Sequence, residues 1–554
     1  MGLTSLPVEI LIQIASSLRV SDLSSLLKCN RKLRIVCIPL LYRHVELRLY
    51  GQQRILMGKV FPLSLLKSES PEYFTGTRSL AIIGCDHYSG TDRDDDEDFL
   101  LMIDRERPVA VPLQHFVERI PNGNLWSFEF KVDFPIIADL FIGVLATQPN
   151  LVNLYISFEN TTQGVRKERV FSVNLPSLKR LKLVEIYRQS DVWILNRILE
   201  TATNLVEIDL SWDLDYPDVN RSTHQGTFTR ILHHRPKILK VANIDMTPQL
   251  LEASGLAEEL HLRDVTFPRD RNQLNLGYNN PHAVISLKNL LITTIPPMMG
   301  YFQKEILDRL LPGLEELHVT VNHLDRDGET EVRESIPIPL ENVLRHAETL
   351  KYLSLFEKTS EGNFFIDSGP VCEAELKIFQ HCGLEEFATT INFYCHERTP
   401  GYWKTFEMSP VDVNYAHYAQ LHKLYIIPDM ISLNDQIDSD QGDFSELNPR
   451  NIFSYQMASM VLTNIGFYTE TKPNLRYLVV GTGNAYRGQK VFLISWDEHI
   501  PPYRKREKQR RTRYLFTLSP PYEIQDFREQ GVKFRCFEGT KFTSGEDRKW
   551  ATVW

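Results

Sequence analysis

The chain has 554 residues, more than one compact core usually organises, so it must contain several domains or one long repeat array. Hydrophobic residues make up 42% and charged residues 24% of it, a composition that excludes wholesale disorder. The net charge of -9 disfavours general attraction to nucleic acid or to an anionic membrane, and we predict neither as a partner.

Three consecutive segments near the N-terminus carry apolar residues at helical spacing. Pro7 suits the first turn of the first segment, Ser21 is expected to cap the second, and Pro39 should end or kink the third. Three helices this short cannot bury all their apolar side chains without a partner. The stripes are Ile10, Leu11, Ile14 and Leu18, then Leu23, Leu26 and Leu27, then Leu33, Val36, Cys37, Leu40 and Leu41.

The pieces LPVEILIQIASSL, SDLSSLLKCNRKLR and IPLLYRHVEL, within residues 5–47, resemble an F-box of the kind common in fungal proteins. The resemblance implies that residues 1–47 form a three-helix module that binds the Skp-type adaptor of a cullin-RING ubiquitin ligase. Leu33 and Tyr42 stand where many members of the family carry Trp. An alternative is a helical cap that seals the first repeat of an array. The predicted adaptor-binding residues are Leu6, Pro7, Ile10, Leu11, Ile14, Leu18, Leu26, Leu33 and Tyr42.

A connecting region, residues 48–124, is expected to follow, and it includes the acidic run DRDDDED at residues 92–98. The run lacks the alternating ligands, the turn glycine and the distal glutamate of an EF-hand. We therefore interpret it as an acidic surface loop.

Between residues 125 and 485 the pattern apolar-x-x-apolar-x-apolar returns repeatedly and predicts a series of short strands. The first three starts are 27 residues apart, within the usual length of a leucine-rich repeat, and later steps are longer. The copies begin at Leu151, Leu178, Leu205, Leu287, Leu314, Leu350, Leu421 and Leu475, with weaker ones at Ile238, Ala257 and Leu384.

Helix-like pieces such as DVWILNRILETAT and EILDRLL separate these strands, so each unit is expected to hold one strand and one helix. The units resemble the irregular leucine-rich repeats of F-box proteins. The predicted fold is therefore α/β: a three-helix F-box followed by an irregular leucine-rich-repeat solenoid with a curved parallel sheet. A general α/β fold whose parallel strands imitate repeats remains an alternative.

Side chains alternate between the two faces of a strand, so every second position of a repeat strand must point away from the helices. In RLKLV the inward residues are Leu181 and Leu183, which leaves Arg180 and Lys182 on the concave face. Solenoids use that face for binding. The predicted target-binding row is Arg180, Lys182, Glu207, Asp209, Glu316, His318, Tyr352, Lys423, Tyr425 and Tyr477.

After the last repeat strand, GTGNAYRG at residues 481–488 reads as a hairpin turn because KVFLISW beyond it has the pattern of another strand. We interpret residues 486–554 as a C-terminal cap. The cap carries seven basic residues in ten at 504–513, either a solvated loop or a nuclear-import or acidic-partner patch.

Seven thinly spread cysteines without a CxxC are typical of a reducing compartment. No apolar run approaches the roughly 18 residues that cross a bilayer, so we expect a cytoplasmic or nuclear protein and no membrane partner. Walker, HExxH and GxSxG signatures are absent, and we predict no enzyme activity, no cofactor and no metal.

These features favour a substrate-recognition subunit of an SCF-type ubiquitin ligase, in which the F-box binds the adaptor and the repeat surface binds an unknown target protein. Two alternatives stay open. One is an F-box scaffold that acts outside ubiquitylation. The other is an unrecognised enzyme on a large α/β domain, which a deep pocket with adjacent pKa-shifted polar residues would reveal.

Overall fold

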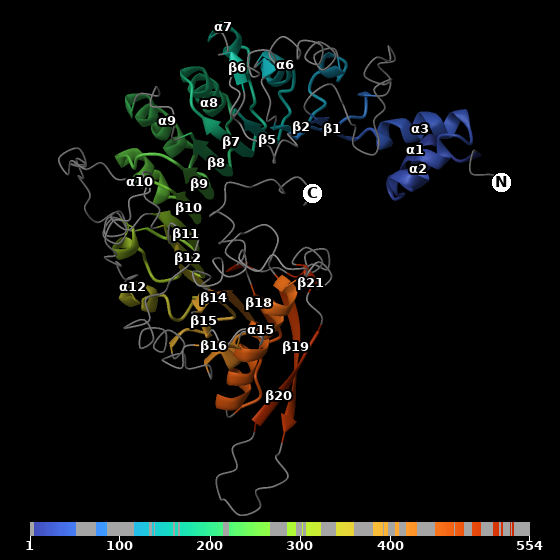
Figure 1. The fold of residues 1–554 in the computed structure, drawn as a ribbon. Coiled ribbons are helices and arrows are strands. Elements are labelled where there is room, and N and C mark those ends of the chain that lie inside the picture. The colour runs from blue at the N-terminus through green and yellow to red at the C-terminus, as the bar shows by residue number, and fades with distance from the viewer. Residues whose placement is uncertain are drawn as a thin grey trace, which may run out of the picture. The chain divides into compact units, whose positions relative to one another are not determined.

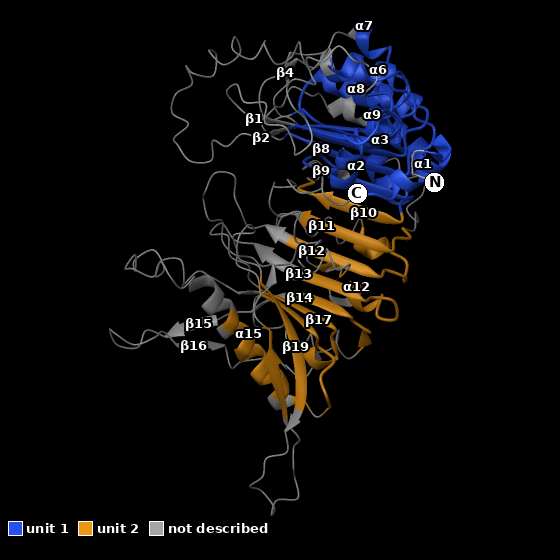
Figure 2. Ribbon diagram, turned by 90° about the vertical axis from the view of Figure 1, so that its right-hand side faces the viewer, with its two compact units in different colours: residues 1–257 blue, residues 258–554 orange. Residues whose placement is uncertain are grey.

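A computed structural model shows two compact units, residues 1–257 and 258–554 (Figure 2). The division falls inside the predicted repeat region, and the predicted domain boundaries stay predictions. The described residues are 5–50, 74–85, 116–131, 136–137, 139–158, 161–163, 167–213, 221–265, 285–294, 302, 306–322, 340–358, 381–391, 393–396, 405–408, 417–428, 449–469, 471–480, 490–499, 513–519, 522–523, 532 and 535–536. The acidic run at 92–98, the turn at 481–488 and residues 504–512 of the basic run lie outside them.

Three helices open the first unit: α1 (Val8–Ser16), α2 (Val20–Leu26) and α3 (Arg31–Leu41). Pro39 lies inside α3, which ends two residues later, as expected of a proline near a helix end. Ser21 does not cap α2, because the helix begins one residue before it and Arg19 is the cap position. The helices share a buried core of Leu11, Ala15, Leu23, Leu33, Val36 and Cys37.

A parallel sheet follows in the first unit, with strand order β1-β2-β3-β5-β7-β8-β9. From β3 to β9, helices connect successive strands of this sheet and lie together on one side of it (Figure 1). The strands are β1 (His44–Tyr50), β2 (Ser79–Cys85), β3 (Ser127–Lys131), β5 (Asn153–Ser157), β7 (Arg180–Ile186), β8 (Glu207–Trp212) and β9 (Ile238–Ala242). The helices are α6 (Asp139–Thr147), α7 (Lys167–Val170), α8 (Gln189–Thr201), α9 (Arg221–His234) and α10 (Pro248–Ser254), and β4 (Ile136–Ile137) pairs separately with β6 (Thr161–Gln163).

Alternation along the strands decides which face of this sheet is buried. In β7, Leu181 and Leu183 are buried on the helix side while Arg180 is exposed on the other. Aromatic rings extend the core from sheet to helix, since the rings of Phe130 in β3 and Phe141 in α6 lie 5.4 Å apart. The repeated apolar residues of each copy are therefore those on the sheet face that packs against the helices.

The start of α8 depends on a buried carboxylate, Asp191. Its Oδ2 accepts the backbone N–H of Arg188 at 3.0 Å, and its Oδ1 accepts the hydroxyl of Ser190 at 3.2 Å. These contacts satisfy groups that the first turn of a helix leaves without partners. Burial nevertheless outweighs them and raises the pKa of Asp191 to about 6.

We expect the stabilisation by Asp191 to fall as pH rises. Its folded-state pKa lies above the unfolded value, so its contribution is fullest below about pH 4 and is lost as pH rises through about 6. Between pH 7 and pH 5 the wild-type chain should gain about 1 kcal/mol of unfolding free energy relative to Asp191→Asn, which cannot titrate. Urea unfolding of both proteins at the two pH values measures the difference. Parallel pH dependences would contradict the prediction.

The second unit continues the same architecture with parallel strand order β10-β11-β12-β13-β14-β17-β18. Its strands are β10 (Glu259–Arg263), β11 (Asn289–Thr294), β12 (Glu316–Asn322), β13 (Tyr352–Lys358), β14 (Glu386–Ile391), β17 (Lys423–Pro428) and β18 (Tyr477–Val480). The described helical elements between β11 and β17 are short: η3 (Leu307–Arg309), α12 (Leu340–Leu344) and η4 (His417–Gln420). β15 (Phe393–His396) and β16 (Thr405–Met408) form an antiparallel pair.

Antiparallel strands end this sheet. β19 (Lys490–His499) pairs with β18, with β20 (Arg513–Leu518) and with β21 (Tyr522–Glu523). The pairing of Val480 with Lys490 confirms that the two strands form a hairpin. The long helix α15 (Pro449–Tyr468) packs so closely on β20 that a Cβ at Gly466 would overlap the Tyr514 carbonyl. A side chain at position 466 would therefore force the helix away from the strand.

The predicted repeat strands are confirmed. Eight strong copies and three weak ones each yield a parallel strand, and most strands begin two residues after the first apolar residue of the copy. DVWILNRILETAT forms α8, but EILDRLL forms only the three-residue turn η3. Three parallel strands of the first sheet were missed, β1, β2 and β3. The α/β class with N-terminal helices and a leucine-rich-repeat-like sheet is established, and the predicted curvature stays a prediction.

Candidate protein-interaction surfaces

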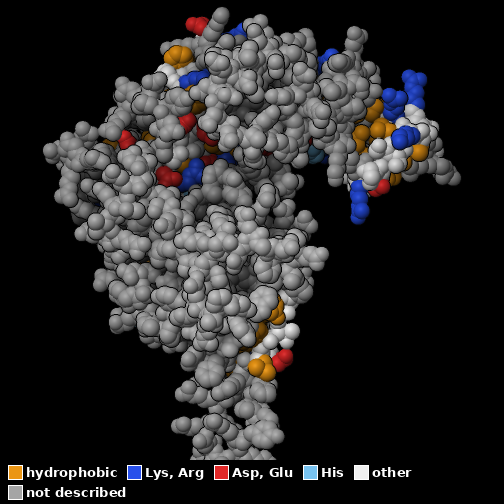
Figure 3. All heavy atoms as spheres, viewed as in Figure 1, with side chains coloured by type: hydrophobic (Ala, Val, Ile, Leu, Met, Phe, Trp, Pro, Cys, Tyr) orange, Lys and Arg blue, Asp and Glu red, His pale blue; other side chains and the backbone are white. Residues whose placement is uncertain are grey.

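Helix α1 exposes apolar side chains that its own module leaves uncovered. Figure 3 shows hydrophobic and basic side chains together on the surface of the N-terminal helices. Leu11 and Ala15, four residues apart, point into the module, so the positions flanking them are turned outward. The exposed set, with exposed fractions, is Val8 42%, Ile10 40%, Ile12 43% and Ile14 36%, and Ile35 of α3 at 64%.

The predicted adaptor-binding residues therefore divide into two groups. Pro7, Ile10 and Ile14 are exposed, and Leu6, Leu18 and Leu26 are half-buried. Leu11, Leu33 and Tyr42 are buried, because they pack inside the chain. In particular the ring of Tyr42 lies 6.2 Å from that of Phe74, beyond the helices. Val8, Ile12 and Ile35 were missed, although their apolar character at the surface of a short helix could have identified them.

The face of the first sheet opposite the helices carries a ladder of charges. Arg180 Nε lies 3.8 Å from Glu207 Oε2, and Lys240 Nζ lies 3.1 Å from Glu207 Oε1. Lys182 Nζ lies 3.5 Å from Asp209 Oδ2. Figure 3 shows acidic and basic side chains adjoining one another near β8 and β9. Parallel register places Arg180 opposite Glu207 and Lys182 opposite Asp209, and Lys240 reaches Glu207 diagonally, so the ladder is a direct consequence of the repeat.

Lys182 also lies over an aromatic ring, with its Nζ 5.0 Å from the ring centre of Tyr155. The carboxyl of Glu129 stands one strand further along, and its pKa is raised by burial against the opposing effect of Lys131. Ion pairs that are partly exposed contribute about 0 to 1 kcal/mol each. The ladder can therefore exchange its internal pairs for pairs with a charged partner at small cost.

The corresponding face of the second sheet is covered. His318 Nδ1 lies 2.7 Å from Ser354 Oγ, and His318 Nε2 lies 3.7 Å from Glu316 Oε2. His318 is 6% exposed and Ser354 1%. Tyr425, at 2%, belongs to an apolar cluster with Ala388, Val479, Val491 and Cys536. Residues from the end of the chain thus lie on the face predicted for the target.

The predicted exposure of the target-binding row is correct only in part. Arg180 is exposed, but His318 and Tyr425 are buried, because the C-terminal residues pack over that part of the second sheet. Tyr425 therefore cannot contribute as a freely accessible side chain while this packing persists. The half-buried members are Lys182, Glu207, Asp209, Glu316, Tyr352, Lys423 and Tyr477.

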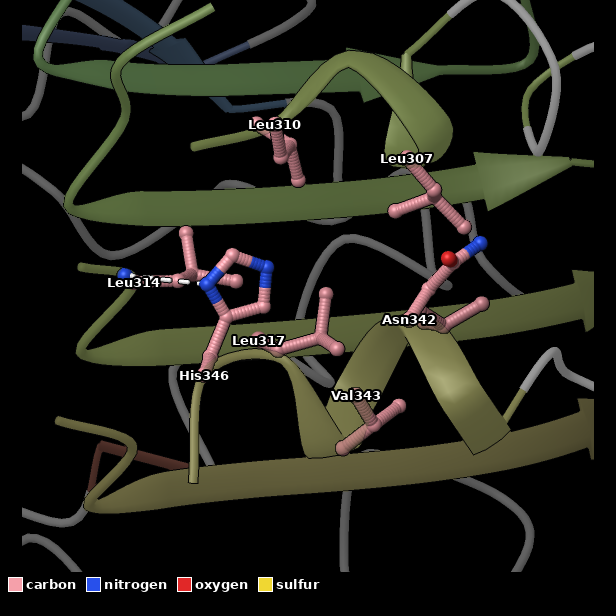
Figure 4. Close-up of a pocket in the computed structure, with 8 residues that line it drawn as sticks. Leu307, Leu310, Leu314, Leu317, Asn342, Val343 and His346 are labelled. Carbon is pink, nitrogen blue, oxygen red and sulfur yellow. Dashed lines mark hydrogen bonds between the residues drawn. The ribbon is translucent and has the colours of Figure 1, made fainter. Parts of the chain in front are cut away.

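A small apolar pocket lies between η3, α12 and β12 of the second unit (Figure 4). Leucines line it, and His346 closes one side, where its Nδ1 accepts the backbone N–H of Leu314 at 3.3 Å. Burial lowers the pKa of His346, which favours the neutral ring needed for this contact. Asn342 is tied to Asp308 by a 2.9 Å hydrogen bond. The polar groups of this pocket thus form hydrogen bonds between two neighbouring repeats.

Comparison with protein-family models gives no match, and neither does comparison with curated protein sequences. Within the ranges described above, no helix is long and apolar enough to span a membrane. In the same ranges, no three His, Cys, Asp or Glu side chains are grouped to hold a metal ion.

Proposed function

We propose that the chain is a substrate-recognition subunit of an SCF-type ubiquitin ligase. The N-terminal helices would bind the Skp-type adaptor, and the sheet face opposite the repeat helices would hold a target protein. The chain would contribute proximity, since a tethered target presents its lysines to the charged ubiquitin carrier at high effective concentration. It would perform no bond chemistry itself.

The exposed apolar surface of α1 is the observation that carries the adaptor half of the proposal. Val8, Ile10, Ile12 and Ile14 occupy two turns of one helix and leave the module with more exposed aliphatic surface than a solvated cap requires. The exposed residues form two pairs, Val8 with Ile12 and Ile10 with Ile14, each one helical turn apart, and exposed apolar surface of this kind favours a protein partner. The F-box resemblance of residues 5–47 specifies which partner this would be.

The charge ladder supports the target half of the proposal. Arg180, Lys182, Glu207 and Asp209 project from neighbouring strands of a sheet whose other face is covered by helices. A repeated, polar sheet face offers an extended surface with many independent contact points. Its mixed charge would set the orientation of a target more than its affinity.

Reconstitution tests the proposal. The chain is combined with adaptor, cullin, RING subunit, ubiquitin and its enzymes, and with proteins that co-purify with the chain. Target ubiquitylation that requires the chain and disappears with Ile10→Asp/Ile14→Asp would support the receptor role. Adaptor binding without transfer to any captured protein would favour the scaffold alternative, and absence of adaptor binding would overturn the proposal.

A further inference from the structure

Cys536 is fully enclosed in the second unit. Its side chain is fully buried, and its Sγ lies 3.2 Å from the Leu353 carbonyl oxygen, 183 residues earlier in the chain. It packs with Ala388, Tyr425 and Val479 on the face of the second sheet opposite the repeat helices, with Val532 against the same cluster. Residues 532 and 536 thus occupy a face that the repeats would otherwise leave open.

The side chain of Glu386 in β14 binds the backbone of Cys536. Glu386 Oε1 accepts the N–H of Cys536 at 2.7 Å, and Glu386 is 2% exposed. Among the described residues, Glu386 Oε2 accepts no hydrogen bond, and Lys423 Nζ lies 3.5 Å from it as a counter-charge. A buried carboxylate on a sheet face is costly unless it is paired, so its position is explained by a ligand that brings donors to it. The chain's own residue 536 is that ligand here.

Arg535 adds a charged contact beside the buried residue. Its Nη1 lies 3.6 Å from Glu316 Oε1, and its side chain remains 38% exposed. Glu316 lies on β12 and Glu386 on β14, two strands further along the sheet, so two carboxylates from separate repeats contact one short segment. The guanidinium of Arg535 pairs with Glu316, and the backbone N–H of the next residue, Cys536, donates to Glu386.

We propose that Val532, Arg535 and Cys536 form an internal ligand that occupies the target site of the second sheet, and that a target presents the same chemistry: an arginine followed directly by a small apolar residue. The idea rests on the proposed function in one respect, that a target uses this face. A target would have to displace the internal ligand, so the free chain is held in a closed, low-affinity state. Displacement would expose Tyr425 together with Ala388 and Val479.

Thiol labelling of the full chain tests whether the segment detaches. With iodoacetamide and peptide mass spectrometry, exposed Cys29 should react first, and Cys536 should react slowly by local opening. Arg535→Ala should speed labelling of Cys536 at least threefold while buried Cys382 keeps its rate. The matched control is Arg476→Ala, an exposed arginine of the same unit. Immediate labelling of wild-type Cys536, or equal rates in both variants, would overturn the proposal.

A peptide supplies the second test. Fluorescent peptide 529–540 is titrated under reducing conditions into the full wild-type chain and into Cys536→Glu, whose carboxylate cannot dock beside Glu386. The peptide should bind the variant at least tenfold more tightly than the wild type, whose site is occupied. Cys536→Ser, which preserves size, should behave as wild type. Equal affinity for all three proteins, or no binding to any, would contradict the internal ligand.

These readouts involve neither the adaptor nor a target. A negative result from labelling and peptide binding, with ubiquitylation intact, would remove the internal ligand and leave the proposed function standing. Positive results from labelling and peptide binding, with no adaptor binding, would support the internal ligand and overturn the proposed function. The two proposals are therefore tested separately.

Discussion

Replacing Ile10 and Ile14 by aspartate is expected to abolish binding of the chain to a Skp-type adaptor. Both side chains are about two-fifths exposed on α1, so the change removes apolar contact area and places two charges at its centre. Full burial of an aliphatic side chain contributes about 1.5 to 3 kcal/mol, and buried unpaired carboxylates add a desolvation cost. We expect at least about a hundredfold loss of affinity, measured by calorimetry or pull-down.

The same substitutions should leave the fold intact because the core of the module is made by Leu11, Ala15 and their partners in α2 and α3. Ser25→Asp is the matched control, since it adds a charge to an exposed position of α2 without removing apolar surface. Circular dichroism and thermal unfolding should be unchanged in all variants. Undiminished adaptor binding by the double variant, with the fold preserved, would overturn the F-box assignment.

Sequence periodicity was sufficient to predict the repeat strands because burial under helices imposes a fixed apolar spacing. Copies as weak as ILKVAN and LEEFAT form strands β9 and β14 in register with their neighbours. The strands β1, β2 and β3 were missed because the sequence around them shows no regular step, although Leu80 and Ile82 of β2 alternate in the same way. The apolar spacing within each copy therefore predicts a strand. The regular interval between copies is what resembles a leucine-rich repeat.

The surfaces were harder to predict because exposure depends on residues distant in sequence. Tyr425 has the same strand position as Lys182, yet it is buried by Cys536, more than a hundred residues later. Nothing in the periodicity of residues 421–426 could indicate that contact. Likewise the stripe on α1 predicted an amphipathic helix, but Leu11 and Ile10 face opposite environments because only three short helices surround them.

Substitutions at adjacent positions of β7 are expected to separate folding from recognition. Leu183 is fully buried, and Leu183→Ala should destabilise the first unit by about 2 to 5 kcal/mol through lost burial and the cavity left behind. Lys182→Ala removes one partly exposed ion pair with Asp209 and the contact with the ring of Tyr155, which together are worth about 1 to 2 kcal/mol at most.

Hydrogen exchange of peptides covering β7 gives the local measurement, since opening of the strand reports its stability within the full chain. Exchange should accelerate strongly in Leu183→Ala and little in Lys182→Ala. Capture of target proteins should fall in Lys182→Ala even though its exchange is nearly unchanged, because Lys182 faces away from the helices. If instead Lys182→Ala opens β7 as much as Leu183→Ala does, the charge ladder serves the fold, and the recognition surface must lie elsewhere.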